Sequence, residues 1–413
     1  MKDKTIHVLL IEDDEGDFII ARSLLEECEE YRFKIGWCQD FDAGINYLQQ
    51  TPADAVLLDL SLPDSQGWET FAKFHEKFPK TPVILLTGLA DEDLSMRAVH
   101  EGAQDYLLKS HLSSYVLSRS ISYSIERRKT EDQLERYAER LKIKNLEMEN
   151  DLRMAREVQL ALMPQKYPAF PRSHGTAAPT LAFAHMYRPS HTLGGDFFNI
   201  LSVSDNLAGV FMCDVMGHGM RAALVTAIIR GLLEQLRSMA VSPGRFLGAL
   251  NRGIVSILDR TEEIIFASAI YMVIEADTGE ATLANAGHPL PMHLSRASGK
   301  TDLLTPPDAG ARGRVLGVRW DSPYPEHSFH LNHGDRLLLY TDGLTEAQSP
   351  TGDQFGTERL RVSATKNAQL EMPEFLQSVT REAEEFTGES GFDDDVCMLS
   401  VMFSGAEQTG DDK

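Results

Sequence analysis

Residues 111–163 contain neither glycine nor proline, and this uninterrupted stretch separates two segments of different composition. Within it, a set of positions recurs at alternating steps of four and three residues, which is the heptad spacing of a helix with one apolar stripe. The positions in this frame, here called the seam, are Leu134, Ala138, Leu141, Asn145, Met148, Leu152, Ala155, Gln159 and Leu162. The pattern predicts one long signalling helix over residues 126–163.

The seam allows two interpretations. One amphipathic helix could pack on its own chain, or two copies of the chain could form a parallel coiled-coil homodimer. We favour the homodimer because Asn145 occupies a seam position, where one buried asparagine can fix the register of two helices. Upstream, Leu117, Ile121 and Ile125 follow another frame, and a break in a heptad pattern changes the supercoil locally. The segment between Ile125 and Leu134 is therefore either a hinge or the end of the coil.

Before residue 111, short apolar runs alternate with amphipathic stretches. The strand-like runs are residues 6–11, 33–38, 55–58, 83–86 and 106–108. Strands that alternate with helices predict a parallel sheet with helices on both faces, so we expect a doubly wound α/β domain of flavodoxin-like type. In such a domain the functional side chains lie at the carboxyl ends of the strands.

Several polar side chains stand at these predicted strand ends. Glu12 and Asp13 follow the first strand, Asp59 ends the third, Thr87 ends the fourth and Lys109 follows the fifth. Carboxylates from two neighbouring strand ends make an oxygen-rich site that suits Mg²⁺. One carboxylate could then attack a phosphoryl donor, while the metal and a lysine offset charge on the phosphoryl oxygens.

This arrangement resembles the response-regulator receiver domain over residues 4–125. The resemblance implies a phospho-acceptor at Asp59 and a histidine kinase or phosphotransfer protein as partner; a degenerate receiver is the alternative. It assigns Glu12, Asp13, Asp59 and the carbonyl of Ser61 to a Mg²⁺ ion, and Thr87, Tyr106 and Lys109 to the switch that responds to the phosphoryl group.

After Pro164 the sequence changes again. Residues 165–179 are rich in Pro, Ser, Gly and Ala, which is typical of a loop. Beyond them, strands and helices do not alternate regularly, so we expect an α+β domain. The strands are predicted at 209–213, 266–275, 281–285, 336–340 and 396–403, and the helices at 222–239, 243–258 and 374–386. The predicted divisions of the chain are 1–125, 126–163 and 164–404, followed by a polar tail, 405–413.

Four acidic motifs are dispersed through this last domain. They are Gly194-Gly195-Asp196, Asp214-Val215-Met216-Gly217-His218-Gly219, Thr341-Asp342-Gly343 and Asp393-Asp394-Asp395. Each motif adjoins an apolar strand or a glycine that lets the backbone approach a metal or phosphate closely. Four carboxylates brought together repel one another unless cations compensate them, so the motifs predict bound hard metal ions. Two ions about 4 Å apart would acidify a water for attack on a phosphoryl group.

Together with residues 157–164 and Asn285-Ala286-Gly287-His288-Pro289, these motifs resemble the metal-dependent protein serine/threonine phosphatase (PPM) family, in its RsbU/SpoIIE-like branch. The resemblance implies that two Mn²⁺ or Mg²⁺ ions are held by the side chains of Asp196, Asp214, Asp342 and Asp394 and the carbonyl of Val215. The register of the last ligand is open by one residue, because Asp393 and Asp395 flank it. His218 and His288 are as readily explained by loop shape as by acid catalysis.

Charge and composition exclude other classes. The formal net charge of −22 disfavours binding to nucleic acid or to an anionic membrane surface. No apolar run is long enough for a membrane span, no signal peptide begins the chain, and the four cysteines have no metal or disulfide spacing, so we expect a cytoplasmic protein. The sequence thus predicts a response regulator that dephosphorylates a phosphoserine or phosphothreonine protein. The family resemblance points to a STAS-domain anti-sigma-factor antagonist as substrate. The alternative is a non-catalytic adaptor that binds a phosphoprotein.

Overall fold

The computed structural model describes residues 5–88, 102–172, 179–259, 265–306 and 313–405. These residues fall into two compact units, Met1–Leu146 and Glu147–Lys413, and each unit is treated by itself below. One helix, α5 (Ser114–Leu162), contributes its first part to the first unit and its last turns to the second.

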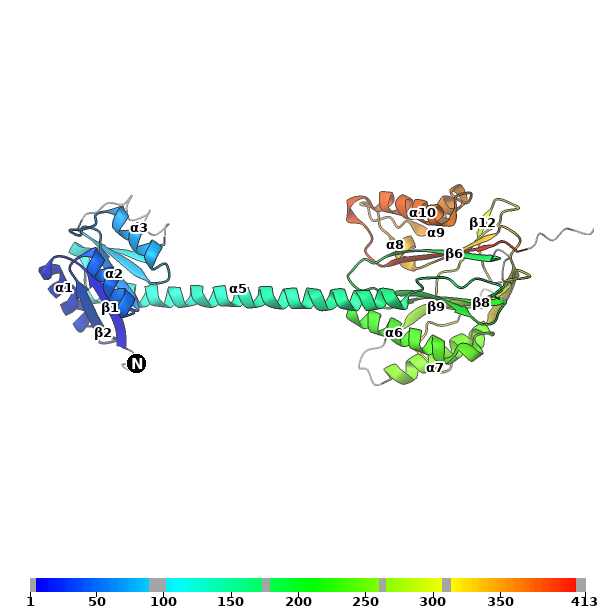
Figure 1. Cartoon of the computed structure of the whole chain (residues 1–413), viewed down its shortest axis with the longest axis horizontal. Helices are drawn as coiled ribbons and strands as arrows, with labels where there is room; N and C mark the ends of the chain where they lie inside the picture. Colours follow the sequence, from blue (N-terminus) through cyan, green and yellow to red (C-terminus); the bar gives the residue numbers. More distant parts are fainter. Residues whose placement is uncertain (1–4, 89–101, 173–178, 260–264, 307–312, 406–413) are drawn as a thin grey trace, which may run out of the picture. The chain divides into compact units, whose positions relative to one another are not determined.

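The first unit contains a five-stranded parallel sheet with strand order β2-β1-β3-β4-β5 (Figure 1). Its strands are β1 (Thr5–Ile11), β2 (Arg32–Cys38), β3 (Ala55–Asp59), β4 (Val83–Thr87) and β5 (Asp105–Leu108). Every residue of β3 and β4 is buried, as expected for central strands of a sheet that is covered on both faces. The predicted doubly wound α/β fold is confirmed.

Helices α1 (Glu15–Glu26), α2 (Phe41–Gln50) and α3 (Trp68–Lys77) cover this sheet. Because side chains alternate along a strand, β1 supplies two separate cores. Leu9 and Ile11 pack in the core that includes residues of α2 and α3, whereas Val8 and Leu10 pack in the core that includes residues of α1 and α5.

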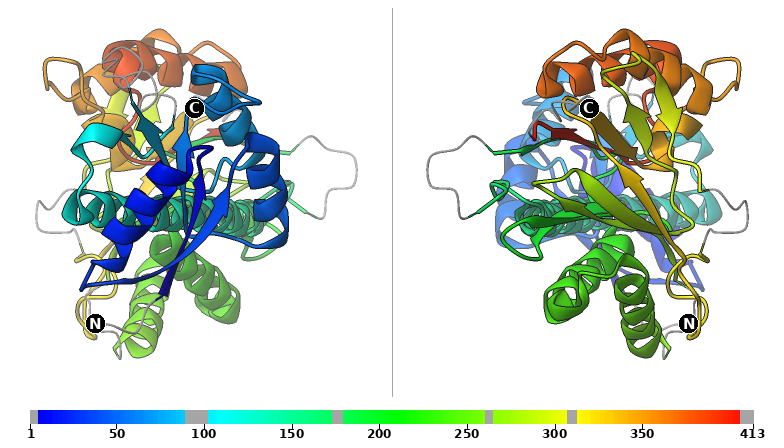
Figure 2. Two further views of the ribbon diagram at one scale, coloured as in Figure 1. Left: turned by 90° about the vertical axis from the view of Figure 1, so that its left-hand side faces the viewer. Right: turned by 90° about the vertical axis from the view of Figure 1, so that its right-hand side faces the viewer.

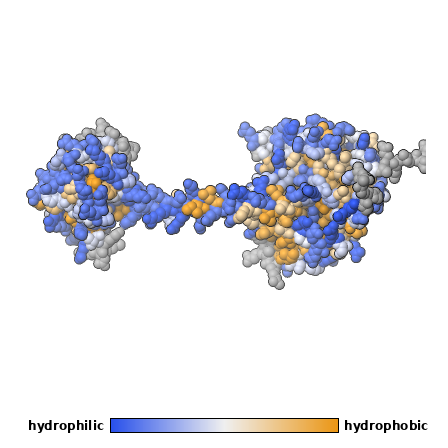
Figure 3. Space-filling model, in the orientation of Figure 1, coloured by the Kyte–Doolittle hydropathy of each residue, from blue (hydrophilic) through white to orange (hydrophobic). Residues whose placement is uncertain are grey.

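The structure gives the two heptad frames of α5 different surroundings. Leu117, Ile121 and Ile125 are buried in the second core of the first unit, so the upstream frame is simply the face by which α5 packs on its own sheet. Downstream, Leu134 and Leu141 are 63% and 62% exposed, and Figure 3 shows hydrophobic surface along the middle of the helix. The helix is continuous between the two frames. An exposed apolar stripe is what a coiled-coil seam needs, and the homodimer stays a prediction.

The second unit is built from two five-stranded antiparallel sheets. One sheet has the order β13-β10-β9-β8-β7, with β7 (Asp196–Ser202), β8 (Leu207–Val215), β9 (Ala267–Glu275), β10 (Glu280–Ala286) and β13 (Glu326–His330). The other has the order β12-β11-β14-β15-β6, with β6 (Leu181–Arg188), β11 (Met292–Leu294), β12 (Thr301–Leu303), β14 (Arg336–Tyr340) and β15 (Val396–Phe403).

Helices cover the outer faces of both sheets. α6 (Met220–Gln235) and α7 (Pro243–Leu258) lie side by side against the first sheet, and α9 (Gly356–Lys366) and α10 (Met372–Thr387) lie against the second (Figures 1 and 2). A short helix, α8 (Asp342–Glu346), follows β14. The inner faces of the two sheets share one large apolar core, which explains the continuous apolar runs in β8 and β9. The expected α+β architecture is confirmed.

The sequence predicted some elements of this unit and missed others, several of them at the edges of the sheets. The predicted ranges 243–258, 336–340 and 396–403 coincide with α7, β14 and β15, whereas the edge strands β6, β7 and β13 were not predicted. Residues 173–178 of the predicted loop and nearly all of the predicted tail, 405–413, lie outside the described residues. Across the part of the chain that the structure describes, no helix is both long and apolar enough to cross a membrane.

Candidate functional site

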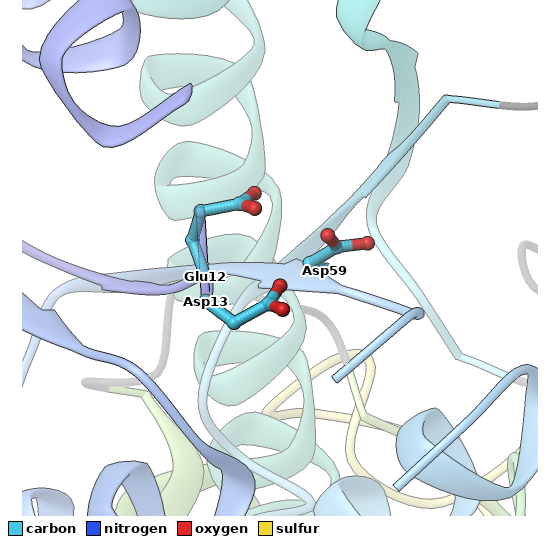
Figure 4. Close-up of side chains that lie close together, drawn as sticks. All are labelled: Glu12, Asp13 and Asp59. Carbon is cyan, nitrogen blue, oxygen red and sulfur yellow. The ribbon is translucent and has the colours of Figure 1, made fainter. Parts of the chain in front are cut away.

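The first acidic cluster lies where two neighbouring parallel strands end. Ile11 of β1 is paired with Leu58 of β3, so Glu12 and Asp59 follow at the same edge of the sheet. Ligand oxygens of Glu12, Asp13 and Asp59 lie within 4.8 Å of one another, and their carboxylates point toward a common space (Figure 4). Glu12 and Asp59 are buried, whereas Asp13 is exposed. This is the convergence that the strand-end pattern predicted.

Lys109 supplies the positive charge of this cluster. Its Nζ lies 2.7 Å from Oε2 of Glu12, 2.7 Å from Oδ2 of Asp59 and 2.8 Å from Oδ2 of Asp17. Burial of the amine acts to lower the pKa of Lys109, but these three carboxylates together raise it above its usual value. The sequence did not single out Asp17, although its place in the first turn of α1, three residues after the N-cap Asp14, was a usable signal.

The carboxylates around Glu12 carry more negative charge than Lys109 can balance. Burial raises the pKa of Glu12 to about 7; the hydrogen bond from Lys109 opposes this rise and the charge of Asp59 adds to it. Four carboxylates around one lysine leave a strongly negative pocket, and oxygen ligands with excess negative charge suit a divalent hard cation. The residues present therefore fit a Mg²⁺ ion.

The other predicted receiver residues are Ser61, Thr87 and Tyr106. The backbone N–H of Ser61 donates to Oδ1 of Asp59 at 3.0 Å, which orients the carboxylate. Thr87 ends β4 and is buried, and Tyr106 is half-buried on the adjacent strand β5, where it pairs with Leu85. Thr87 is thus on the strand next to the one that carries Asp59, and Tyr106 is one strand further along the sheet.

The second cluster is centred on a cross-strand pair of carboxylates. Asp196 begins β7 and is directly opposite Asp214 of β8, so the two side chains project from the same face of the sheet. Thr341, which follows β14 of the other sheet, donates its hydroxyl to Oδ2 of Asp196 at 2.6 Å. Residues that are far apart in the sequence are in this way joined across the two sheets.

The carboxylates of this cluster repel one another, and this repulsion raises their pKa values. Burial and then the charge of Asp214 raise the pKa of Asp196 well above its usual value. Burial and then the charges of Asp342 and Asp394 raise the pKa of Asp214 to about 7. The pKa of Asp342 is likewise raised, by burial and by Asp394. Among the described residues, no lysine or arginine forms an ion pair with these four carboxylates, so bound cations are the fitting source of positive charge.

Beside these carboxylates, the backbone at Gly195 packs closely against the backbone at Val215. A Cβ atom on Gly195 would lie 2.4 Å from the carbonyl oxygen of Val215 and 3.3 Å from Oδ1 of Asp214, so no larger residue fits there. The Val215 carbonyl and the Asp214 carboxylate therefore both lie beside Gly195. In the described residues, only the first cluster brings three ligand atoms within 4.8 Å, so the second is more widely spaced.

The three consecutive aspartates near β15 have different surroundings. Asp395 is buried, and its two oxygens accept from the N–H of Ser190 at 2.9 Å and the N–H of Gly195 at 2.7 Å. Asp394 is exposed, and its negative charge acts on Asp214 and Asp342. Asp395 therefore holds the loop 190–195, whereas Oδ1 of the exposed Asp394 accepts from the N–H of Asp395 at 2.7 Å.

One seam residue has a different role from the one that its spacing suggested. Gln159 is buried in the second unit, where its Nε2 donates to the carbonyl of Gly194 at 2.7 Å and its Oε1 accepts from the Gly194 N–H at 3.3 Å. Leu162 packs against the core of the same unit. The prediction of a coiled-coil seam is therefore wrong for Gln159, because its side chain is buried in its own domain.

The two histidines considered from the sequence also differ. His288 is buried, and burial lowers its pKa to about 3, so it is a neutral side chain that pairs with the hydroxyl of Ser268. His218 is exposed and stacks on His191 with ring centroids 4.2 Å apart. His191, which the sequence analysis did not notice, lies in the loop that Asp395 holds.

Two family models match the chain, one in each domain. Residues 8–118 match the family model described as "Response regulator receiver domain", and residues 204–404 match the model described as "Stage II sporulation protein E (SpoIIE)". The chain therefore joins a receiver domain at residues 8–118 to a SpoIIE-type domain at residues 204–404.

Two curated relatives from Bacillus subtilis (strain 168) match the chain in part. The chain is 26% identical to "Phosphoserine phosphatase RsbU" over 206 residues, which are 50% of this chain and 56% of that protein. It is 30% identical to "Phosphoserine phosphatase RsbP" over 161 residues, which are 39% of this chain and 38% of that protein. The match thus spans about half of the first relative and less of the second.

A solved structure, the SiaA-PP2C domain of Pseudomonas aeruginosa, shares the fold. It superposes with a TM-score of 0.52 and 23% sequence identity, covering 63% of this chain and 98% of that domain. At this level of identity the likeness establishes the architecture of the second unit alone.

Proposed function

We propose that the chain is a two-component response regulator whose SpoIIE-type domain hydrolyses phosphoserine or phosphothreonine on a partner protein. The observation that carries the proposal is the convergence of Asp196, Asp214 and Asp342 from separate elements, each with a raised pKa. Such mutually repelling carboxylates are kept together where divalent cations bind them. The RsbU and RsbP relatives are both named phosphoserine phosphatases, which supports the reaction class.

Each residue of the second cluster has a specific task in this proposal. Asp196, Asp214, Asp342 and Asp394, with the carbonyl of Val215, hold two Mn²⁺ or Mg²⁺ ions. When bound, such a pair of ions supplies a water that is acidic enough to attack phosphorus at neutral pH. The hydroxyl of Thr341 fixes the orientation of Asp196. The wider spacing of these carboxylates, compared with the first cluster, suits two ions rather than one.

In the receiver, we assign Asp59 as the phospho-acceptor. Glu12, Asp13 and Asp59, with the carbonyl of Ser61, would hold one Mg²⁺, and Lys109 would pair with the phosphoryl oxygens. Lys109 already contacts Asp59 at 2.7 Å, so it lies where the new charge would form. Thr87 and Tyr106 would then respond as the switch. The phosphoryl donor would be a histidine kinase or a phosphotransfer protein.

Control would pass through α5, the continuous element that contributes to both units. Its start packs on the receiver sheet through Leu117 and Ile121, and its end is tied to Gly194 through Gln159. A change in the pairing of two receivers would alter the crossing of two α5 helices in a homodimer. Because Gly194 precedes Asp196 by two residues, movement at the end of α5 would act on a metal ligand.

The substrate that we propose is a STAS-domain anti-sigma-factor antagonist, and the proposed location is the cytoplasm. The substrate follows from the resemblance to the RsbU/SpoIIE-like branch, and the location follows from the sequence features that led us to expect a cytoplasmic protein. Each acidic cluster has one exposed member, Asp13 in the first and Asp394 in the second. Both clusters can therefore be reached by a partner protein, as phosphoryl transfer between proteins requires.

The deciding experiment is hydrolysis of p-nitrophenyl phosphate and of a phosphorylated STAS protein in Mn²⁺, with and without acetyl phosphate. We expect hydrolysis that EDTA abolishes and that acetyl phosphate changes in rate. The variant Asp59→Ala should take up no phosphoryl group by intact mass and lose the response, whereas Asp42→Ala, an exposed aspartate elsewhere in the receiver, should retain both. Binding of the phosphoprotein without hydrolysis in Mn²⁺ would favour the adaptor instead.

A further inference from the structure

A polar cavity lies in the SpoIIE-type domain, at the opposite end of β14 from Asp342. It has a volume of about 370 Å³ and is enclosed by the ends of β11 and β14 and by the segment that joins α9 to α10. Its walls include the side chains of Arg336, Arg296, Ser295, Gln369 and Glu371. None of the residues that line it belongs to either acidic cluster.

Arg336 is the feature of this cavity that demands an explanation. It is only 7% exposed, and burial lowers its pKa from the usual value. Its Nη2 donates to the carbonyl of Leu370 at 2.9 Å, and its guanidinium lies over the ring of Phe375 at 4.7 Å. Its Nη1 is buried and has no hydrogen-bond partner among the described residues. A buried guanidinium is costly unless a counter-charge and hydrogen-bond acceptors satisfy it.

The surroundings supply little of that compensation. Glu371 is near enough to influence Arg336, yet the two form no ion pair within 4.0 Å. The second cation, Arg296, extends across Gly334, where an added Cβ would lie 2.2 Å from its Cδ, and it is not ion-paired within the described part of the chain. Two arginines and one glutamate leave the cavity with a net positive charge in a chain whose overall charge is −22.

We propose that this cavity binds a small ligand through a phosphate group. Arginine forks match phosphate oxygens in pairs of hydrogen bonds, and Arg336 and Arg296 both line this cavity. Ser295 and Gln369 also line the cavity and carry a hydroxyl and an amide, which can donate hydrogen bonds. A phosphate group offers enough acceptors for all of these donors, whereas a carboxylate has two oxygens. The site is independent of the proposed phosphatase reaction, since it needs no metal.

Isothermal titration calorimetry of the full chain tests the proposal, with inorganic phosphate in one series and glycerol 3-phosphate in another. Divalent ions are first removed on a chelating resin, so that neither acidic cluster recruits phosphate through a metal. We expect one binding site per chain. Binding of both ligands would mean that the phosphate group of a monoester suffices, and binding of inorganic phosphate alone would identify the free ion as the ligand.

Three variants locate the site. Arg336→Met, which preserves contact with Phe375, and Arg296→Gln, on the exposed rim, should each weaken binding about tenfold or more. Arg361→Gln removes the same charge from α9 outside the cavity, where Arg361 pairs with Glu358, and should bind like the native chain. Should Arg336→Met fail to fold by circular dichroism, Arg296→Gln decides the matter. Absence of binding by the native chain, or equal binding by Arg296→Gln and Arg361→Gln, would overturn the proposal.

Discussion

The side-chain amide of Gln159 bonds to both backbone groups of Gly194, donating to its carbonyl and accepting from its N–H. Both residues are buried, so no water competes for these bonds. Gly194 precedes Gly195, which packs against the Val215 carbonyl beside the second cluster. The end of α5 is thereby fastened to the loop that presents Asp196.

Replacing Gln159 by alanine should weaken metal binding at the second cluster. Gln159→Ala leaves the N–H and carbonyl of Gly194 buried without partners, at about 1–3 kcal/mol for each group. We expect the Mn²⁺ concentration for half-maximal hydrolysis of p-nitrophenyl phosphate to rise several-fold. Gln165→Ala is the control, because Gln165 is exposed and bonds to Leu160 rather than to the loop. Identical Mn²⁺ requirements in the two variants would show that the Gln159 contact does not affect metal binding.

Removing one carboxylate charge from the proposed metal site should abolish hydrolysis without unfolding the domain. In Asp214→Asn and in Asp342→Asn, loss of a ligand charge weakens cation binding, while relief of repulsion keeps thermal stability at or above that of the native chain. Activity is measured with p-nitrophenyl phosphate at saturating Mn²⁺, and unfolding by differential scanning calorimetry. Asp393→Asn, an exposed neighbour in the acidic run, should remain active. Near-normal turnover in Asp214→Asn would refute the ligand assignment.

Asp394 and Asp395 should separate cleanly into a functional and a structural residue. Asp394→Asn is expected to lose metal-dependent hydrolysis with little change in melting temperature. Asp395→Asn presents an NH₂ group to one of two backbone N–H donors, so it should lower the melting temperature, by about 2–4 °C for each kcal/mol lost. The reverse assignment holds if Asp394→Asn melts early and remains active.

Mg²⁺ binding to the receiver should strengthen as pH rises. Burial raises the pKa of Glu12 to about 7, and Mg²⁺ binds the deprotonated carboxylate, so a proton must be released at lower pH. The apparent affinity should therefore increase with pH up to about 7 and level off above it. Trp37, whose indole N–H donates to the Glu12 carbonyl at 2.8 Å, provides a fluorescence signal. Glu12→Gln should bind Mg²⁺ more weakly and without this pH dependence, and a persisting dependence would point to another group.

Breaking the exposed part of the seam should uncouple input from output. Leu141→Lys combined with Met148→Lys places two charges on the apolar stripe, so the chain should be monomeric by light scattering and insensitive to acetyl phosphate. Basal hydrolysis should persist, since no proposed ligand is changed. The matched control, Gln133→Lys with Asn150→Lys, adds the same charges to exposed positions off the seam. A monomeric double variant that still responds to acetyl phosphate would rule out coupling through a dimer.

The sequence by itself determined the features that depend on local periodicity. Alternating strands and helices predicted the receiver sheet, and because parallel strand ends meet at one edge, Glu12, Asp13, Asp59 and Lys109 could be grouped before their coordinates were known. Two strands of the second domain's core, β14 and β15, could also be predicted, because they are apolar apart from Arg336 and Ser400.

Only the tertiary structure decided which of several similar residues takes each role. The sequence alone does not distinguish Asp394 from Asp395. In the structure, Asp395 accepts hydrogen bonds from Ser190 and Gly195, some 200 residues away, and so has a structural role. Spacing alone put Gln159 on a dimer seam, whereas its amide satisfies Gly194 inside its own domain. The cavity beside Arg336 has no signature in the chain, because its walls come from segments that share no period. Periodic patterns fix which face of an element is buried, and packing between distant segments fixes which polar groups meet there.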